Sequence, residues 1–353
     1  MEKTAKTKSN WLLIWLLAAV AIAGGYLGGT VVLKGEMEKW IADAVGRPVQ
    51  IDVLQGTFPP GITAKGITLA QEPDAANLPF AIHKVIARFS FLSLLRGQFG
   101  LDVELISPVI SMERSSDGTW RLPVNARSAG GGRGGLPVVR LRVRDAEITI
   151  IDKFVSPEAM WFFRKVSLSA KREAGGLYMY TFLSALEGLD RQPVGQVGVT
   201  GSVSFKEQAA EAHLSADYSA LEFLAPYIQL AIGAAPSRGT CSINSAITVR
   251  GREFSADTKF IGKGILFAME QPTALGPSGN RLVELLKDRE GRVHLTFTIA
   301  GKLGEQMDWS GLITGTVREA MRQAMARSIQ KVLGSSETNV GESVQKGVES
   351  LGR

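Results

Sequence analysis

Few residues of this 353-residue chain have the type and spacing that enzyme chemistry needs. His83, His213 and His294 lie far apart, and no two of them have the spacing of a helical metal site. The single cysteine, Cys241, has no histidine nearby and lies in an alternating run, which indicates a buried or idle thiol. We interpret each histidine as structural, and one cysteine cannot form an intrachain disulfide.

Two short motifs resemble catalytic signatures. Ser343-Val344-Gln345-Lys346 has the S-x-x-K pattern of some acyl enzymes, but it lies in a polar tail without the companion motifs. The glycines between 130 and 135 precede a strand-like run and no Gly-Lys-Ser/Thr, which indicates a linker rather than a phosphate loop. We interpret Asp145 and Asp152 as surface or turn acids. The sequence therefore predicts a protein that is not an enzyme, with no catalytic, cofactor or metal site.

The basic residues are spread along the chain, which has a formal net charge of +6. This charge suits an anionic membrane surface at least as well as nucleic acid, and we predict no nucleic-acid partner. One ordered group consists of Arg140, Arg142 and Arg144, which alternate with apolar residues. These arginines could contact phosphates, lipid headgroups or nucleic acid, or they could form the solvated face of a strand.

The segment from Trp11 to Leu33 contains no charged residue. As a helix it would measure roughly 34 Å, which exceeds a hydrocarbon core of about 30 Å. Three lysines precede it and the charges directly after it cancel, which predicts a cytoplasmic N-terminus and a single-pass inner-membrane protein with a periplasmic bulk. The alternative is a signal peptide cleaved near Ala21-Ile22-Ala23, although the apolar run continues beyond that point.

Most of the chain after residue 48 has the two-residue period of β-strands. The clearest runs are Val49–Val53, Ile82–Phe89, Leu101–Ile106, Val139–Ile150, Val197–Phe205, Ile243–Val249 and Val293–Ile299. Runs of this length between glycine-rich turns predict a mainly β fold with a long antiparallel sheet. Within 139–150 the apolar positions change parity after Asp145, which reverses the faces unless a bulge or tight turn intervenes.

Three amphipathic or apolar helices are predicted beside the sheet, at Gly35–Val45, Ala220–Ile232 and Ile313–Leu333. The first follows the membrane segment, so Trp11 and Trp40 are candidate membrane-interface residues, although its apolar stripe could equally cap the first sheet. The last is basic, and Arg318 and Arg322 are its candidate membrane-interface residues. We favour packing of this last helix on the protein's own sheet.

The sequence divides into six segments by composition and period. They are a cytoplasmic tail (1–10), a transmembrane helix (11–33), an N-terminal β region (34–126), a Gly-rich linker (127–136), a C-terminal β region ending in the amphipathic helix (137–333) and a polar tail (334–353).

Several loose motifs occur in an order that resembles the AsmA-like family of envelope proteins. They are Val45-Gly46-Arg47-Pro48-Val49, Phe58-Pro59-Pro60-Gly61-Ile62, Leu92-Ser93-Leu94-Leu95-Arg96-Gly97, Ser107-Pro108-Val109-Ile110, Asp117-Gly118-Thr119-Trp120, Ala225-Pro226-Tyr227, 285–293 and Ala300-Gly301-Lys302-Leu303. Together they cover most of residues 10–333. The chain is shorter than many members, and 301–306 departs from their Gly-Asp-Leu-Asp-Asp-Pro-like turn.

The resemblance implies a curved, gutter-like antiparallel sheet with an apolar concave face. A sheet with one apolar face must bury it on a partner layer or on lipid. The candidate groove residues are Val139, Leu141, Val143, Ile148 and Ile150. In this hypothesis the protein binds membrane phospholipids by their acyl chains and assists lipid transport or outer-membrane biogenesis. The alternative is a non-enzymatic scaffold or regulator that binds other envelope proteins through sheet edges or the basic helix.

Overall fold

The structure is a computed structural model that describes residues 33–39, 41–43, 46–57, 61–69, 78–89, 100–123, 138–188, 190–218, 220–268, 272–303 and 311–330. Over these residues the protein is mainly β with a few helices, which confirms the predicted fold class at that level. The strands form a 13-stranded sheet whose order follows the chain, with β5 paired to β4 beside the main path. Antiparallel neighbours of this kind need only hairpins to connect them.

The strands are β1 (Val49–Thr57), β2 (Gly61–Leu69), β3 (Phe80–Phe89), β4 (Leu101–Arg114), β5 (Trp120–Arg121), β6 (Val138–Asp152), β7 (Ala159–Arg172), β8 (Leu177–Glu187), β9 (Pro193–Ser204), β10 (Ala209–Tyr218), β11 (Pro236–Arg250), β12 (Glu253–Phe267) and β13 (Arg292–Lys302). The helical elements are η2 (Ala174–Gly176), η3 (Leu221–Leu224), α3 (Ala225–Ile232) and α4 (Gly279–Leu286). Residues 33–39, 41–43 and 311–330 are helical too.

The three predicted helices are confirmed over their described residues, whereas α4 was not predicted. This helix spans eight residues, too few for the 11 to 18 residue window in which a helical period stands out. The strand predicted at Leu101–Ile106 continues to Arg114, and its pairing with β3 keeps one register through Pro108 to Ile110, although Ser107 takes a left-handed φ of 50°.

The first of two compact units comprises Met1–Ile110 and Leu122–Val139. Its buried core consists of Val49, Ile51, Leu54, Ala64 and Ile67 from β1 and β2. Apolar residues of the preceding helix, including Met37 and Ile41, pack against this core. The apolar stripe of that helix therefore caps the first strands, as one of the two interpretations predicted.

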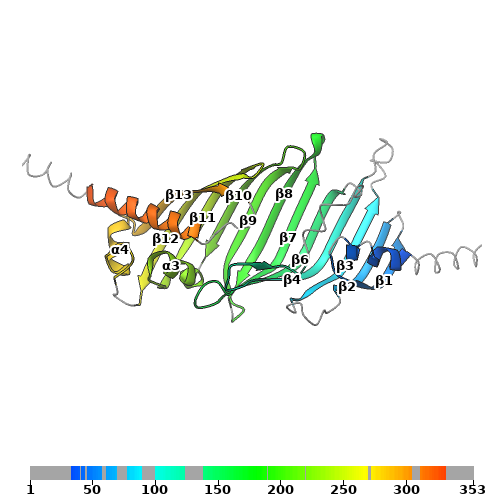
Figure 1. Cartoon of the computed structure of the whole chain (residues 1–353), viewed down its shortest axis with the longest axis horizontal. Coiled ribbons are helices and arrows are strands. Elements are labelled where there is room, and N and C mark those ends of the chain that lie inside the picture. The colour runs from blue at the N-terminus through cyan, green and yellow to red at the C-terminus, as the bar shows by residue number, and fades with distance from the viewer. Residues whose placement is uncertain are drawn as a thin grey trace, which may run out of the picture. The chain divides into compact units, whose positions relative to one another are not determined.

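The second unit comprises Ser111–Arg121 and Arg140–Arg353. Its strands β6 to β13 pair antiparallel, each with the next along the chain. Figure 1 shows α3, α4 and the helix of residues 311–330 beside β11, β12 and β13. The last helix thus packs within its own unit, against α3, α4 and Phe267 of β12, whereas we favoured packing on the sheet itself.

Two bulges explain the change of parity in β6. Asp145 takes a φ of 53°, and the register shifts between Val143 and Ala146. Lys165 of β7 takes a φ of 50°, and the register shifts back between Ala146 and Ile148. Each bulge adds one residue to one strand, so the apolar side chains before and after Asp145 stay on the same face of the sheet.

In the described part of the chain, no helix has both the length and the apolar character that crossing a membrane requires. The predicted membrane segment, apart from Leu33, and the predicted linker at 127–136 lie outside the described residues.

Candidate functional site

One face of the second unit's sheet is apolar from strand to strand. Its central row consists of Val143, Leu168, Phe182, Val199 and Leu214, each directly opposite the next in β6 to β10. We call the side that carries this row the apolar face. Its interior rows carry no charged residue, while Asp152 and Arg172 lie on it at strand ends.

The opposite side, called the polar face, carries the alternate residues of the same strands. Arg140 lies opposite Lys171 there, and His213 lies opposite Thr200 and Ala246. The arginine run of β6 therefore belongs to the polar face, which agrees with its interpretation as one solvated strand face. The two faces differ in this way because successive side chains of a strand point to opposite sides.

The apolar face is also the more enclosed of the two. Ala216 and Ala256 on the apolar face are 3% and 9% exposed, whereas Ala246 and Ala300 on the polar face are exposed. An alanine side chain is a single carbon, so this difference reports the position and not the side chain. The enclosed face is thus the apolar one, which is the side that the lipid hypothesis requires to be hollow.

Helices cover only part of the apolar side. At what we call the covered end, Ile232 of α3, Leu282 of α4 and Phe267 of β12 are 0%, 2% and 7% exposed. Val317 and Met321 of the last helix pack against them. Along what we call the open stretch, Leu141, Leu168, Phe182 and Leu214 of β6, β7, β8 and β10 remain half-buried. These large apolar side chains keep surface that a ligand could bury.

A polar cluster lies at the end of β6 and β7, near the first turn of α3. The Tyr227 hydroxyl donates to Asp152 Oδ2 at 2.8 Å, and Trp161 Nε1 donates to the Tyr227 hydroxyl at 3.1 Å. Arg114 lies 3.7 Å from the same Asp152 oxygen, and the Phe154 amide donates to Asp152 Oδ1 at 3.0 Å. Both oxygens of this carboxylate are occupied, so it is suited to holding strands together and not to proton transfer.

The charged side chains of this cluster are buried, so each of them depends on its partner for stabilisation. Asp152 and Arg114 are 3% and 6% exposed, and the Arg114 guanidinium lies 4.2 Å from the centre of the Phe154 ring. Burial raises the pKa of Tyr227 above its ordinary value, and its hydrogen bond to Asp152 raises it further. The interpretation of Asp152 as a surface or turn acid was therefore wrong, while Asp145 is exposed.

The predicted groove residues occupy one face of β6. Leu141 and Val143 lie opposite Ala170 and Leu168, and Ile148 and Ile150 lie opposite Phe163 and Trp161. Val139 is the preceding alternate residue of the strand, and all five predicted residues are half-buried. No sequence pattern within β6 identified their partners on β7 and β8, because pairing between strands depends on register.

The four predicted membrane-interface residues differ in where the structure places them. Trp11 and Trp40 lie outside the described residues. Arg318 donates from Nε to the Ala231 carbonyl at 2.8 Å, which ties its helix to the end of α3. Arg322 pairs with Glu319 at 2.9 Å and is exposed.

Among the histidines and the cysteine, His294 has an acidic partner, since its Nε2 lies 3.0 Å from Asp288 Oδ2. His83, His213 and His294 are all exposed, and no metal-ligand cluster occurs among the residues that the structure describes. Cys241 is 5% exposed, and burial, with a smaller effect of Asp217, raises the pKa of its thiol to about 12. The prediction of a buried or idle thiol is confirmed.

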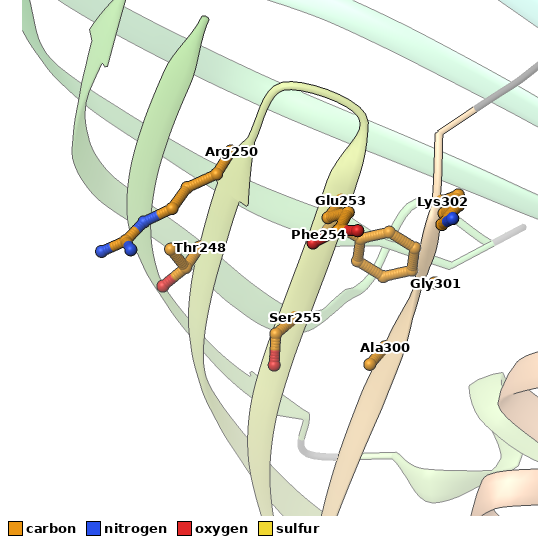
Figure 2. A pocket seen from close by; sticks show the side chains of 8 residues that line it. All are labelled: Thr248, Arg250, Glu253, Phe254, Ser255, Ala300, Gly301 and Lys302. Atoms are coloured by element: carbon orange, nitrogen blue, oxygen red, sulfur yellow. The ribbon is translucent and has the colours of Figure 1, made fainter. Parts of the chain in front are cut away.

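An open hollow of about 590 Å³ lies near the end of β11, β12 and β13. Figure 2 shows Thr248 and Arg250 on β11, Ser255 on β12 and Ala300 on β13, with the Phe254 ring turned toward Gly301. Thr248, Ser255 and Ala300 form one cross-strand row, and Arg250, Glu253 and Lys302 form the next. The short side chains make the floor of the hollow and the long charged ones its rim.

Comparison with known proteins assigns this chain to no family. No protein-family model matches the chain, and none of the curated proteins matches it. The resemblance to the AsmA-like family therefore stays a prediction from its motifs.

Proposed function

We propose that the apolar face binds phospholipid acyl chains, and that the protein assists lipid transport or outer-membrane biogenesis as an AsmA-like protein. The observation that carries this proposal is the uninterrupted apolar row from Val143 to Leu214, whose large side chains stay half-buried. Each methylene buried there contributes about 0.8 kcal/mol, so one acyl chain can supply substantial binding free energy.

The absence of interior charge on this face supports a hydrocarbon ligand over a polar one. Three of the hydroxyl groups that do occur there are satisfied within the protein. Ser245 and Thr258 lie 3.0 Å apart as a hydrogen-bonded pair, and the Ser184 hydroxyl donates to the Ala185 carbonyl at 2.9 Å. A ligand on this face therefore needs shape and apolar surface, with few hydrogen bonds to orient it.

The proposed setting is the periplasmic side of an inner membrane, with Trp11 to Leu33 as the anchor. This location rests on the charge asymmetry around the apolar segment. An anchor there would tether the chain to a bilayer, which is the source of its proposed ligand. Bound phospholipid would leave unchanged, since the proposal includes no catalytic step.

Site-specific photocrosslinking of the full chain in cells tests this proposal. A benzophenone amino acid at Phe182 would face the proposed ligand, and the same amino acid at Thr181 is the matched control on the polar face. We expect mass spectrometry to find lipid adducts at position 182 and few at position 181. Equal adducts at both positions, or none at 182, would contradict the proposal.

A pair of substitutions sharpens the same test. Leu214→Glu places a charge in the central row, whereas His213→Glu places it on the exposed polar face next to that row. We expect Leu214→Glu to abolish the lipid adducts at position 182, because burying an unpaired carboxylate in hydrocarbon is strongly unfavourable. His213→Glu should leave the adducts unchanged.

The alternative function, a scaffold for envelope proteins, has one observation in its favour. Among the described strands β13 pairs only with β12, so its other edge beyond Val293, which forms a single bridge with Lys287, can accept a strand from another protein. Under this alternative, crosslinks from β13 would trap one dominant protein, and position 182 would give no lipid adduct.

A further inference from the structure

The loops that join β7 to β8, β9 to β10 and β11 to β12 lie along one edge of the second unit's sheet, because every second connection in an antiparallel meander returns to the same edge. We call this edge the hairpin edge. We propose that the hairpin edge docks on the surface of an anionic membrane, with Phe205 entering the interface between headgroups and acyl chains. This inference goes beyond acyl-chain binding, since a scaffold protein could dock in the same way.

Phe205 is the first observation in its support. It follows the last residue of β9, Ser204, and is 72% exposed. Its ring lies 5.6 Å from the ring of Tyr178 in the neighbouring hairpin, at an interplanar angle of 73°. The contact holds two aromatic rings at the tip of the edge, and aromatic rings favour the membrane–water interface.

Charge is the second observation. The hairpin edge has six basic side chains, Lys171, Arg172, Lys206, Arg250, Arg252 and Lys302, and three acidic ones, Glu173, Glu207 and Glu253. Among ion pairs of the described residues, Lys171 with Glu173 at 2.8 Å is the one that uses these cations. An excess of cations around an exposed aromatic ring is the pattern of proteins that lie on anionic bilayers.

The opposite edge of the same unit lacks this excess. Lys153 there pairs with Glu113 at 2.9 Å, and Arg292 pairs with Asp288 at 3.1 Å. The two edges therefore differ in charge balance, and a membrane would distinguish one from the other. This difference means that the hairpin edge, and not the opposite edge, should face the membrane.

The hollow at the end of β11 to β13 adds room for a headgroup. Its floor of Thr248, Ser255 and Ala300 lies beside the side chains of Arg250 and Lys302. Glu253 lies between these two cations in the same cross-strand row, so a phosphate would bind beside either cation, above the hydroxyl groups of the floor. Glu253 also lines the hollow, so zwitterionic headgroups with an amine are accommodated beside the phosphate.

Fluorescence quenching in the full chain tests the docking. Glu207→Cys on the hairpin edge and Glu158→Cys in the β6–β7 loop of the opposite edge each provide one exposed thiol for an environment-sensitive dye. The native Cys241 stays unlabelled because it is buried. The labelled chain is reconstituted in vesicles of phosphatidylethanolamine and phosphatidylglycerol that contain nitroxide lipid. A second arm places the nitroxide lipid in added vesicles instead, which distinguishes the protein's own bilayer from a facing one.

We expect quenching of the dye at 207 in one of the two arms and little quenching at 158 in either. Phe205→Ser should reduce quenching at 207 by at least half, since the ring is the inserted group. Arg250→Gln should raise the concentration of added vesicles needed for half-maximal quenching by about fivefold, or weaken quenching in the protein's own bilayer. Equal quenching at 207 and 158, or none at 207 in both arms, would overturn the docking proposal and leave the lipid adducts at Phe182 as a separate question.

Discussion

The covered end and the open stretch belong to one apolar face and have reached different degrees of burial. Ile232 and Leu282 at the covered end are 0% and 2% exposed, because three helices pack together there. Phe182 and Leu214 in the open stretch have side chains at least as large and are half-buried. At the covered end the protein's own helices bury these side chains almost fully. In the open stretch the apolar surface that is still exposed can be buried by a ligand.

This difference means that the two regions should respond differently to substitution. Residues of the covered end contribute mainly to the free energy of unfolding, because their apolar surface is already removed from water. Residues of the open stretch contribute less to stability and more to ligand binding. The following experiments test this division, in order of decreasing expected effect.

Asp152→Ala is expected to have the largest effect on stability. It would remove the carboxylate that lies 3.7 Å from the buried Arg114, and removing one member of a buried pair costs about 3–5 kcal/mol. Urea unfolding of the full chain measures the change. Asp145→Asn is the matched control in the same strand, since Asp145 is exposed, and it should not change the unfolding midpoint measurably. Similar losses for both variants would show that the buried cluster contributes no more to stability than an exposed acid of the same strand.

Leu282→Ala tests the covered end directly. We expect a loss of about 2–5 kcal/mol in the free energy of unfolding, because a fully buried leucine leaves a cavity. Leu214→Ala in the open stretch should cost less than half as much, since its side chain is half-buried. Thermal and urea unfolding give the comparison. The contrast between the two regions fails if Leu214→Ala is the more destabilising variant.

Alkaline pH should weaken the end of the sheet around Cys241 and Tyr218. Burial raises the pKa of each group to about 12, from ordinary values of 9.0 for the thiol and 10.0 for the phenol. Their neutral forms are therefore favoured in the folded state. The contribution of these two groups to the free energy of unfolding should be fully present below pH 9. Above that, it should fall by up to about 1.4 kcal/mol per pH unit for each group between its ordinary and its raised pKa.

Melting temperatures recorded from pH 7 to pH 11 measure this fall. Cys241→Ala removes the thiol and should delay the onset of the loss to about pH 10, where the unfolded tyrosines begin to ionise. A melting temperature that stays constant up to pH 11 would mean that these groups are not enclosed as the structure describes.

Local pattern predicted much of the fold. The alternation of Val139, Leu141 and Val143 with arginines predicted a strand with one apolar and one basic face, and the register confirms two such faces. The change of parity after Asp145 allowed either reversed faces or a bulge. Pairing with β7 decided for the bulge, because Val143 and Ala146 lie opposite two residues of β7 that share a face.

The polar cluster was beyond sequence reasoning. Tyr227 and Asp152 are 75 residues apart, and Tyr227 and Trp161 are 66 apart, so no short window contains Tyr227 together with either of its partners. Asp152 follows an apolar strand and precedes a turn, which is the usual context of a surface acid. Its burial results from α3 packing at the strand end, and packing between distant segments has no local pattern.

The sequence by itself determined that strands β6 to β13 carry one apolar and one polar face, because the two-residue period of side chains is a property of each strand alone. It also determined that Cys241 has no histidine nearby in the chain and that no two histidines have metal-ligand spacing. Only the tertiary structure decided how much of the apolar face is covered. That depends on where α3, α4 and the helix of residues 311–330 pack, and contacts between residues far apart in the chain set their positions.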